Sequence, residues 1–194
     1  MAYCLAADVK TYLGISGAGD DTLITALISR AQKAIDTYTQ RTFEASADTE
    51  RTFDTSRDVD GPTLYLDEDL CAITTITNGD GTEVTATEYT TEPRNRTPYY
   101  AIRLLSSANV FWMQSTTTYD PEDAITVEGR WAFSTTAPAD VVHACIRLAA
   151  YYYRQKDAQV FDTTATPELG IITVPQGIPR DVELLLTPYR KLTP

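Results

Sequence analysis

The sequence is short of the side chains that carry most metal and enzyme chemistry. Its 194 residues include one histidine and three cysteines. Cys4, Cys71 and Cys145 are odd in number, lie far apart and form no C-x-x-C pair, so neither a disulfide framework nor a zinc site is predicted. His143 lies in an apolar stretch, and we expect it to be buried in a packing role. We therefore predict no catalytic residues, no metal site and no cofactor, and we expect a reducing environment.

Long apolar runs are also missing. No stretch of about 18 apolar residues occurs, and the first residues lack a basic region followed by an apolar core, so neither a membrane span nor a secretion signal is expected. Hydrophobic residues make up 43% of the chain and charged residues 22%, which is typical of a soluble globular protein. A chain of this length suits one domain, or one domain with a subdomain.

Positive charge is scarce. The chain has 27 acidic and 16 basic residues, for a formal charge of −11. This balance argues against tight binding to a phosphate backbone, which depends on clustered lysine and arginine. The excess of negative charge is concentrated in residues 43–92, which hold 13 carboxylates and only two basic residues, Arg51 and Arg57.

Four segments have helical patterns. Apolar residues at helical spacing predict helices over residues 5–13, with Gly14 just past the end, and over residues 21–38. Further helices are predicted over residues 139–155, after Pro138, and over residues 181–186. The third helix has little polar surface and contains three successive tyrosines, which cannot all face one core. It is either central in its own domain or in contact with another subunit.

Threonine-rich runs between the second and third helices predict strands. They cover residues 63–66, 72–77, 82–87, 99–105 and 124–133. The turn Asn78-Gly-Asp-Gly81 joins the second and third of these, since Asn-Gly favours tight hairpins. We predict an α+β fold: a small helical bundle of about four helices, with an inserted antiparallel β-subdomain. The expected boundaries are 1–43 for the first helices, 44–133 for the β-subdomain, and 134–194 for the last helices with a long connection over residues 156–178.

One acidic stretch partly matches a calcium loop. Ser56, Asp58 and Asp60 alternate before Gly61, and Asp67 stands at the twelfth position. The first position is Ser and the twelfth lacks the usual Glu, so the match is incomplete. A calcium-dependent or carbohydrate-binding β-module, with Ser56, Asp58, Asp60 and Asp67 as ligands, is the alternative function.

Five segments together resemble the head-tail connector (adaptor) proteins of long-tailed bacteriophages: Leu5–Gly14, Leu23–Phe43, Ile125–Trp131, Pro138–Tyr152 and Leu185–Leu192. The resemblance covers about the helical two-thirds of the chain and rests on the ordered set rather than on one motif. It implies a non-enzymatic structural protein of the virion neck, assembled in the host cytoplasm into a ring of commonly twelve copies. The implied partners are the portal protein, a stopper or tail-completion protein, and genome DNA that passes through the lumen without sequence-specific binding; no membrane is involved. Another neck or tail-completion protein is the second alternative.

The resemblance gives two groups of residues a possible role. We expect a subunit or partner interface formed by aromatic and aliphatic residues of the third helix, the long connection and the C-terminal segment, namely Tyr151, Tyr152, Tyr153, Phe161, Ile171, Ile172 and Tyr189. Carboxylates of the β-subdomain would form an acidic lumen that repels DNA phosphates, namely Asp58, Asp60, Asp67, Glu68 and Asp69. The acidic segment could equally face outward.

Overall fold

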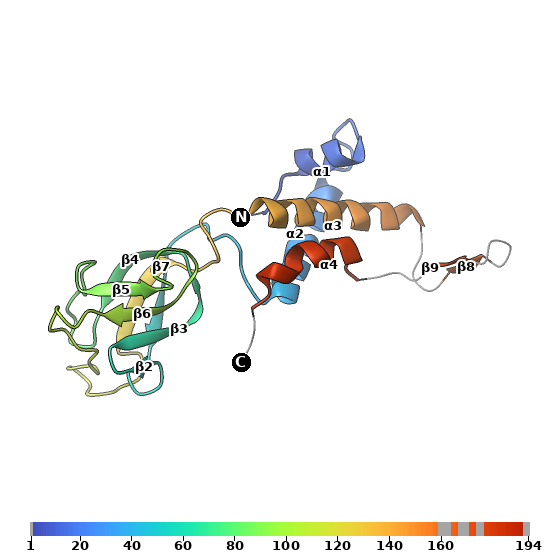
Figure 1. Cartoon of the computed structure of the whole chain (residues 1–194). Coiled ribbons are helices and arrows are strands. Elements are labelled where there is room, and N and C mark those ends of the chain that lie inside the picture. The colour runs from blue at the N-terminus through green and yellow to red at the C-terminus, as the bar shows by residue number, and fades with distance from the viewer. Residues whose placement is uncertain (1, 159–163, 167–170, 174–176, 192–194) are drawn as a thin grey trace. The chain divides into compact units, whose positions relative to one another are not determined.

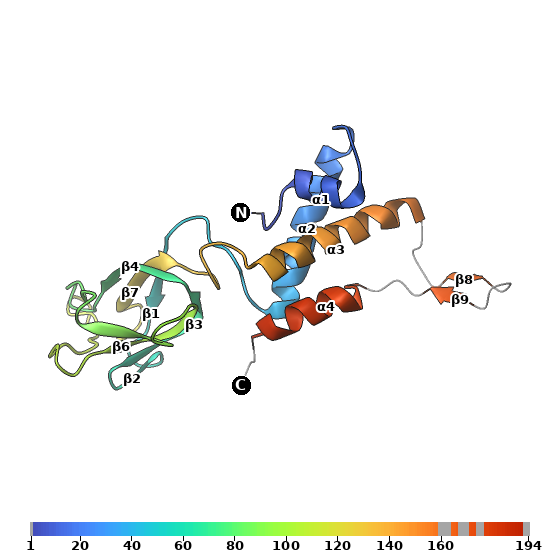
Figure 2. The ribbon, with the colours of Figure 1, turned by 45° about the horizontal axis from the view of Figure 1, so that its top comes forward.

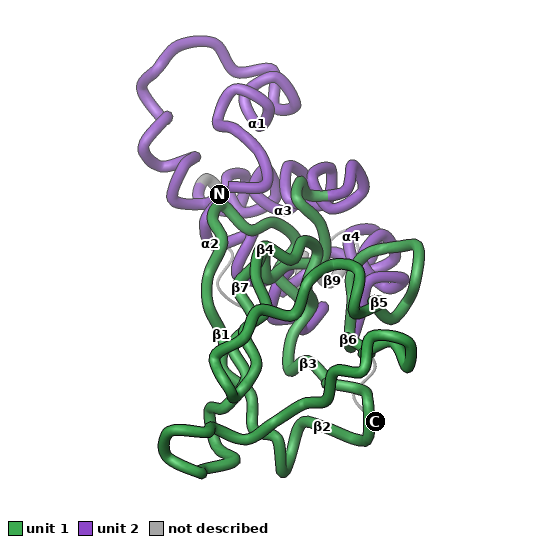
Figure 3. The backbone as a smooth tube through the Cα atoms, turned by 90° about the vertical axis from the view of Figure 1, so that its left-hand side faces the viewer, with its two compact units in different colours: residues 1, 41–137 green, residues 2–40, 138–194 purple. Residues whose placement is uncertain are grey.

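A computed structural model of the chain describes residues 2–158, 164–166, 171–173 and 177–191. The chain forms two compact units, coloured separately in Figure 3. Residues 41–137 make up the β unit, and residues 2–40 together with 138–194 make up the helical unit. The predicted α+β class, with helices flanking an inserted antiparallel β region, is confirmed.

The helical unit contains α1 (Ala6–Leu13), α2 (Asp21–Thr39), α3 (Ala139–Ala158) and α4 (Arg180–Leu186), followed by a 3-10 turn at Thr187–Tyr189. The Leu5 backbone N–H donates to Asp8 Oδ2 at 2.8 Å, which caps the start of α1. Gly14 ends that helix with φ +71°, a left-handed conformation that favours glycine. In α2 the buried residues Ile24, Ile28, Ala31 and Ile35 repeat every three or four positions and form one apolar stripe. The unit also includes a short hairpin of β8 (Thr164–Thr166) and β9 (Ile171–Thr173).

Helix α3 is the central helix of its unit. Figures 1 and 2 both show it lying between α1 and α4, with α2 crossing it, and all three helices pack against it. Its buried residues lie on several sides, namely Val141, Ala144, Cys145, Leu148, Ala149, Ala150 and Tyr152. The first alternative for this apolar helix, a central place in its own domain, is therefore the one found.

His143 is exposed, so the prediction of a buried imidazole was wrong. Its ring stands edge-on to Tyr12 of α1, with the two ring centroids 6.3 Å apart. Buried residues lie on both sides of His143 in the sequence of α3, but His143 itself faces solvent. Apolar neighbours in the sequence therefore did not reveal the direction of its side chain.

The β unit has two antiparallel sheets. The first has three strands in the order β1-β7-β4, with β1 at Thr49–Phe53, β7 at Ile125–Arg130 and β4 at Ala72–Thr77. The second has four strands in the order β2-β3-β6-β5, with β2 at Val59–Asp60, β3 at Thr63–Leu70, β6 at Tyr99–Leu104 and β5 at Tyr89–Glu92. The chain passes from one sheet to the other at Cys71, between β3 and β4.

Both sheets contribute to one core. Its buried members are Phe53, Leu64, Leu70, Ile76, Val84, Ile102, Leu104, Ile125, Val127 and Trp131. In β7, residues 125, 127 and 129 are buried while the alternate positions are partly exposed, as the alternation in its sequence predicts. Gly129 permits close pairing here, because a Cβ atom at this position would lie 2.2 Å from the Ala72 carbonyl oxygen.

The strand predicted over residues 82–87 is wrong except for one bridge between Glu83 and Thr77. The predicted turn before it does form, with the Asn78 N–H donating to the Thr82 carbonyl at 2.8 Å. However, its left-handed residue is Gly81, at φ +81°, and not the Asn-Gly pair. Gly79 is needed for a different reason: a Cβ there would lie 2.0 Å from the Met113 carbonyl oxygen. The turn is thus shaped by a distant segment that local sequence does not show.

Candidate functional site

Tyr152, one of the predicted interface residues, is covered by its own chain. Its side chain is only 9% exposed, and the Arg30 guanidinium of α2 lies 4.6 Å from its ring centroid. Its hydroxyl donates to the Gly177 carbonyl oxygen at 3.4 Å. Burial raises the pKa of this hydroxyl. The ring therefore helps to hold α3 against α2.

The other described tyrosines of that group are half-buried. The Tyr153 hydroxyl donates to Asp20 Oδ2 at 2.5 Å, and this hydrogen bond, with Lys156 nearby, lowers the pKa of the Asp20 carboxyl. The Tyr189 hydroxyl lies 3.3 Å from Asp140 Oδ2. Tyr151 stacks loosely beside Tyr152, with ring centroids 6.1 Å apart. Phe161 lies outside the described residues, and the side chains of Ile171 and Ile172, which belong to β9, are not described either.

Tyr151 lies in a shallow groove between α1, α3 and α4. We call it the α1–α3–α4 groove; it has a volume of about 210 Å³ and is lined by Tyr12, Arg147, Ala150, Tyr151, Arg154, Pro179, Asp181 and Val182. An ion pair between Arg147 and Asp181 joins α3 to α4 at this groove. The groove has tyrosine rings in its wall, and its charged side chains are Arg154 and the paired Arg147 and Asp181.

Sequence reasoning missed the largest exposed apolar side chains of the helical unit. Leu184 of α4 is 67% exposed and Leu5, before α1, is 68% exposed. The signal for Leu184 was present, because Val182 and Leu186 are buried at helical spacing and a residue midway between them must face away.

The five predicted lumen carboxylates occupy different environments. Asp69 is largely buried and forms an ion pair with Arg41, so it does not contribute an exposed negative charge. Asp58 accepts hydrogen bonds from Arg57 and from the Asp54 N–H, which lower its pKa. Asp60 is exposed. Asp67 and Glu68 are exposed on β3, and both pair with Arg51 of β1, at 2.9 Å and 2.8 Å.

These contacts do not assemble the calcium loop that the sequence suggested. Asp58 turns toward Arg57 and the Asp54 backbone, whereas Asp67 turns toward Arg51 on another strand. Within the residues that the structure describes, no group of three or more His, Cys, Asp or Glu side chains is placed to hold a metal ion. No described helix has the length and apolar character needed to cross a membrane.

A second surface on the β unit is built around arginines. Four of the unit's arginines, Arg41, Arg51, Arg57 and Arg130, pair with carboxylates. In the part of the chain that the structure describes, Arg94, Arg96 and Arg103 have no salt bridge. Arg94 and Arg103 line a pocket of about 850 Å³ beside β5 and β6, which we call the arginine pocket. Sequence reasoning did not identify it.

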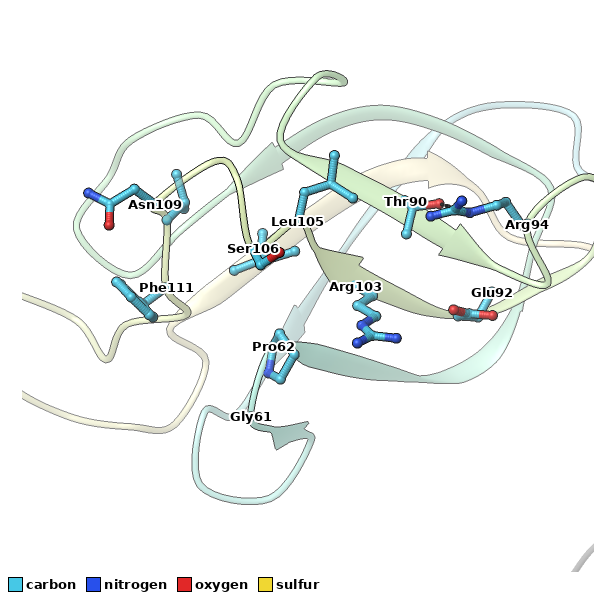
Figure 4. Close-up of a pocket in the computed structure, with 12 residues that line it drawn as sticks. Gly61, Pro62, Thr90, Glu92, Arg94, Arg103, Leu105, Ser106, Asn109 and Phe111 are labelled. Atoms are coloured by element: carbon cyan, nitrogen blue, oxygen red, sulfur yellow. Dashed lines mark hydrogen bonds between the residues drawn. The ribbon is translucent and has the colours of Figure 1, made fainter.

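Figure 4 shows how the arginine pocket is formed. Arg103 extends from β6 into the space between Pro62 and Glu92, and Arg94 lies beside Thr90 of β5, donating from Nε to Oγ1 at 3.1 Å. Phe111, which is 72% exposed, forms part of the wall farther along. The pocket thus combines the guanidinium groups of Arg94 and Arg103 with the carboxylate of Glu92, and its aromatic ring lies apart from them.

The chain was compared with curated proteins, with solved structures and with protein-family models. A search of curated proteins gave no match. Among solved structures, a chain from the neck of an empty gene transfer agent particle, computed with C6 symmetry, is 16% identical, with a TM-score of 0.58, and covers 98% of this chain and 91% of its own. A chain from the neck of the native particle, computed with C12 symmetry, is 17% identical with the same TM-score, covering 97% and 88%.

A third similar chain comes from the virion of the native gene transfer agent particle. It is 19% identical, with a TM-score of 0.60, and covers 98% of this chain and 91% of its own. At these identities the likeness shows a shared fold, including both the helical and the β part. A family model gives the assignment: the head completion protein model matches residues 5–192. The resemblance to phage head-tail connectors noted in the sequence is thereby confirmed, and the chain belongs to the head completion protein family.

Proposed function

We propose that this chain is a non-enzymatic structural subunit of the neck of a tailed phage or phage-like particle. There it forms a ring that joins the portal of the capsid to a stopper or tail-completion protein and leaves a channel for genome DNA. The observation that carries the proposal is the head completion family match over residues 5–192. The similarity of almost the whole chain to neck chains of a gene transfer agent adds support.

The surfaces of the two units suit a ring. A cyclic ring uses a head-to-tail contact, which joins two different patches of the same chain. The helical unit offers the α1–α3–α4 groove and the exposed Leu184, and the β unit offers acidic strands and the arginine pocket. We propose twelve copies, because one similar neck structure was computed with C12 symmetry.

The interface within the ring is proposed to involve Tyr151, Tyr153 and Tyr189, together with Phe161, Ile171 and Ile172 of the long connection. The three tyrosines are half-buried, so each has ring surface left for a neighbour. Tyr152 supports this surface from beneath, since its ring is already buried against Arg30. Loss of the Tyr152 ring would therefore destabilise the folded subunit, and assembly of the ring would be impaired as a consequence.

We further propose that the β unit turns its exposed carboxylates, Asp60, Asp67 and Glu68, toward the DNA channel. Like charges keep a duplex off a wall and let it slide. Asp58 and Asp69 contribute less, because both are held by arginines. A charge reversal at Asp60, which has no salt bridge in the described part of the chain, should slow or trap DNA passage.

Cross-linking mass spectrometry on whole particles tests the neck role. Expected products link this chain to a second copy of itself and to the portal protein. Cross-links to tail components alone would favour the second alternative, a tail-completion protein, and a chain found only free in the lysate would overturn the proposal. A structure of the assembled ring with residues 43–92 wholly on the outside would overturn the acidic channel while leaving the neck role intact.

A further inference from the structure

Two cysteines that are 141 positions apart in sequence meet in the helical unit. Cys4 Sγ lies 3.6 Å from Cys145 Sγ, and both side chains are buried. Cys4 precedes α1, and Cys145 lies in the first half of α3. The third cysteine, Cys71, belongs to the β unit, where it occupies the corner between β3 and β4. All three are free thiols in this structure.

The contact makes the two sulfurs chemically unequal. The hydrogen bond between them lowers the pKa of Cys4 and raises the pKa of Cys145, and burial raises the latter further. Cys4 is therefore the sulfur that ionises more readily. It also lies in the short segment before α1, outside any helix; because it is buried, an oxidant reaches it only through a local opening of that segment. Cys145, in the first half of α3, has the position of a resolving thiol.

We propose that Cys4 and Cys145 form a redox-modifiable pair that closes into an intrachain disulfide. A disulfide requires sulfurs about 2.05 Å apart, so the pair must approach by about 1.6 Å. Cys145 is fixed within α3, so closure of the disulfide requires the non-helical residues before α1, which carry Cys4, to shift.

The reaction balances with a small-molecule disulfide as the oxidant, such as oxidised glutathione. The Cys4 thiolate attacks one sulfur of the oxidant, forming a mixed disulfide and releasing one thiolate. The Cys145 thiol then loses its proton and attacks the Cys4 sulfur, which forms the Cys4–Cys145 bond and expels the second thiolate. The protein loses two electrons and two protons, and the oxidant becomes two thiols.

The cross-link would matter because of how this fold is connected. The helical unit is made of residues 2–40 and 138–194, with the whole β unit between them. A bond between Cys4 and Cys145 would join these two segments covalently and close a very long loop, the geometry in which a disulfide removes most entropy from the unfolded chain. Disulfides persist at virion surfaces and are rare in the cytosol, so the bond would form after the protein leaves a reducing interior.

Thiol counting on the intact, folded chain tests the proposal. The wild type is incubated with oxidised glutathione, then denatured, alkylated and digested. We expect alkylatable thiols to fall from three to one, a mass loss of two hydrogens, and a peptide containing residue 4 linked to one containing residue 145. Thermal unfolding should shift upward by about 5–10 °C and return on reduction.

Matched variants separate this pair from other thiol chemistry. Cys71→Ser should keep the cross-link and its thermal shift, whereas Cys4→Ser and Cys145→Ala should lose both. The counting experiment needs no variant, so a poorly folded Cys145→Ala protein would not block the test. Three alkylatable thiols after oxidation, or cross-links that involve only Cys71 or a second chain, would overturn the proposal.

Discussion

The helical unit and the β unit differ in how the chain builds them. The β unit is continuous, from residue 41 to residue 137, while the helical unit combines residues 2–40 with residues 138–194. Every contact between α2 and α3 therefore closes a loop of at least 100 residues, and closing this loop costs chain entropy that the packing of the helices must offset. The β unit has a hydrophobic core formed by its own residues.

The two units also differ in charge. The β unit carries 17 acidic and 7 basic residues, and the helical unit 10 acidic and 9 basic. Nearly all of the chain's net charge of −11 thus belongs to one unit. The near-neutral helical unit is suited to apolar contacts with neighbours, and the acidic β unit to contacts or repulsion governed by charge.

The largest effect is expected at Tyr152. Tyr152→Asp would place a charge where the ring now packs under Arg30, at a side chain that is 9% exposed. We expect a loss of about 4 kcal/mol in unfolding free energy, confined to the helical unit, because that unit alone uses the ring. Circular dichroism melting should show the helical signal lost at lower temperature, with the β signal kept.

Tyr65→Asp is the matched control for this substitution. Tyr65 lies on β3 with about half of its surface exposed, so the same change there should cost little. Equal melting of both variants would show that α3 is not the central support of its unit. Simultaneous loss of both signals would show that the two units unfold together.

The next effect lies in the β unit, at Gly129. A Cβ atom there would lie 2.2 Å from the Ala72 carbonyl oxygen, which is backbone and cannot rotate away. Gly129→Ala should therefore separate β4 from β7 and lower the unfolding free energy by about 3 kcal/mol. Gly19→Ala, with nothing within 4 Å of the added atom, is the control and should change little. A melting curve for Gly129→Ala like that of the control would contradict the close pairing of β4 and β7.

The ion pair between Arg41 and Asp69 gives a third and smaller effect. Both side chains are mostly buried, and among the described residues none accepts a hydrogen bond from Arg41 Nε, so Asp69 is the carboxylate that balances the Arg41 charge. Asp69→Asn should cost about 2 kcal/mol. Asp67→Asn, at a carboxylate that is 61% exposed, should cost about 0.5 kcal/mol or less. Chemical denaturation measures both, and equal costs would mean that burial does not strengthen the Arg41 pair.

Local patterns were enough to predict most elements of this fold. Gly14 ends α1, the apolar stripe of Ile24, Ile28 and Ile35 forms α2, and Pro138 precedes α3. These features act over a few residues, so they can be read without knowing what the segments pack against. The α+β class and the family resemblance followed from the order of such elements.

Long-range contacts explain what the sequence did not reveal. The Cys4–Cys145 contact and the arginine pocket join segments far apart in the chain, and no periodicity marks either of them. Likewise Asp69 looks like its neighbours Asp67 and Glu68 in an acidic run, yet it alone is buried against Arg41. Residues 82–87 have strand-like composition but make only one bridge, because tertiary context decides whether a partner strand is present.

The last comparison concerns carboxyl groups that respond to pH in opposite directions. In the β unit, the pKa values of Asp48, Asp58, Asp80 and Glu88 are all lowered by hydrogen bonds, led by those from Thr74, Arg57, Thr82 and Thr85 respectively. These carboxylates stabilise the fold at pH values above the ordinary carboxyl pKa. This stabilisation is lost as the pH falls through their lowered pKa values. Among the described carboxyl groups of the helical unit, Asp20 has a lowered pKa and Asp36 has a pKa raised by burial.

Asp36→Asn tests this difference with the smallest expected effect. Because the pKa of Asp36 is raised in the folded state, the unfolded chain ionises first as pH rises, and the wild type loses stability between the ordinary aspartate pKa of about 3.9 and the raised value. Asparagine keeps the acceptor for the Tyr3 hydroxyl, now 2.6 Å from Asp36 Oδ1, and removes the buried charge. At neutral pH the variant should be more stable than wild type by less than about 1 kcal/mol, since the side chain is half-exposed. Asp20→Asn should show the opposite sign, being less stable at neutral pH, so at pH 7 the denaturation curves of the two variants should diverge from wild type in opposite directions, and at pH 3 both should lie closer to wild type. If both variants are destabilised at neutral pH, then Asp36 is held as a favourable charge by Tyr3 and Lys33, and burial is not its dominant environment.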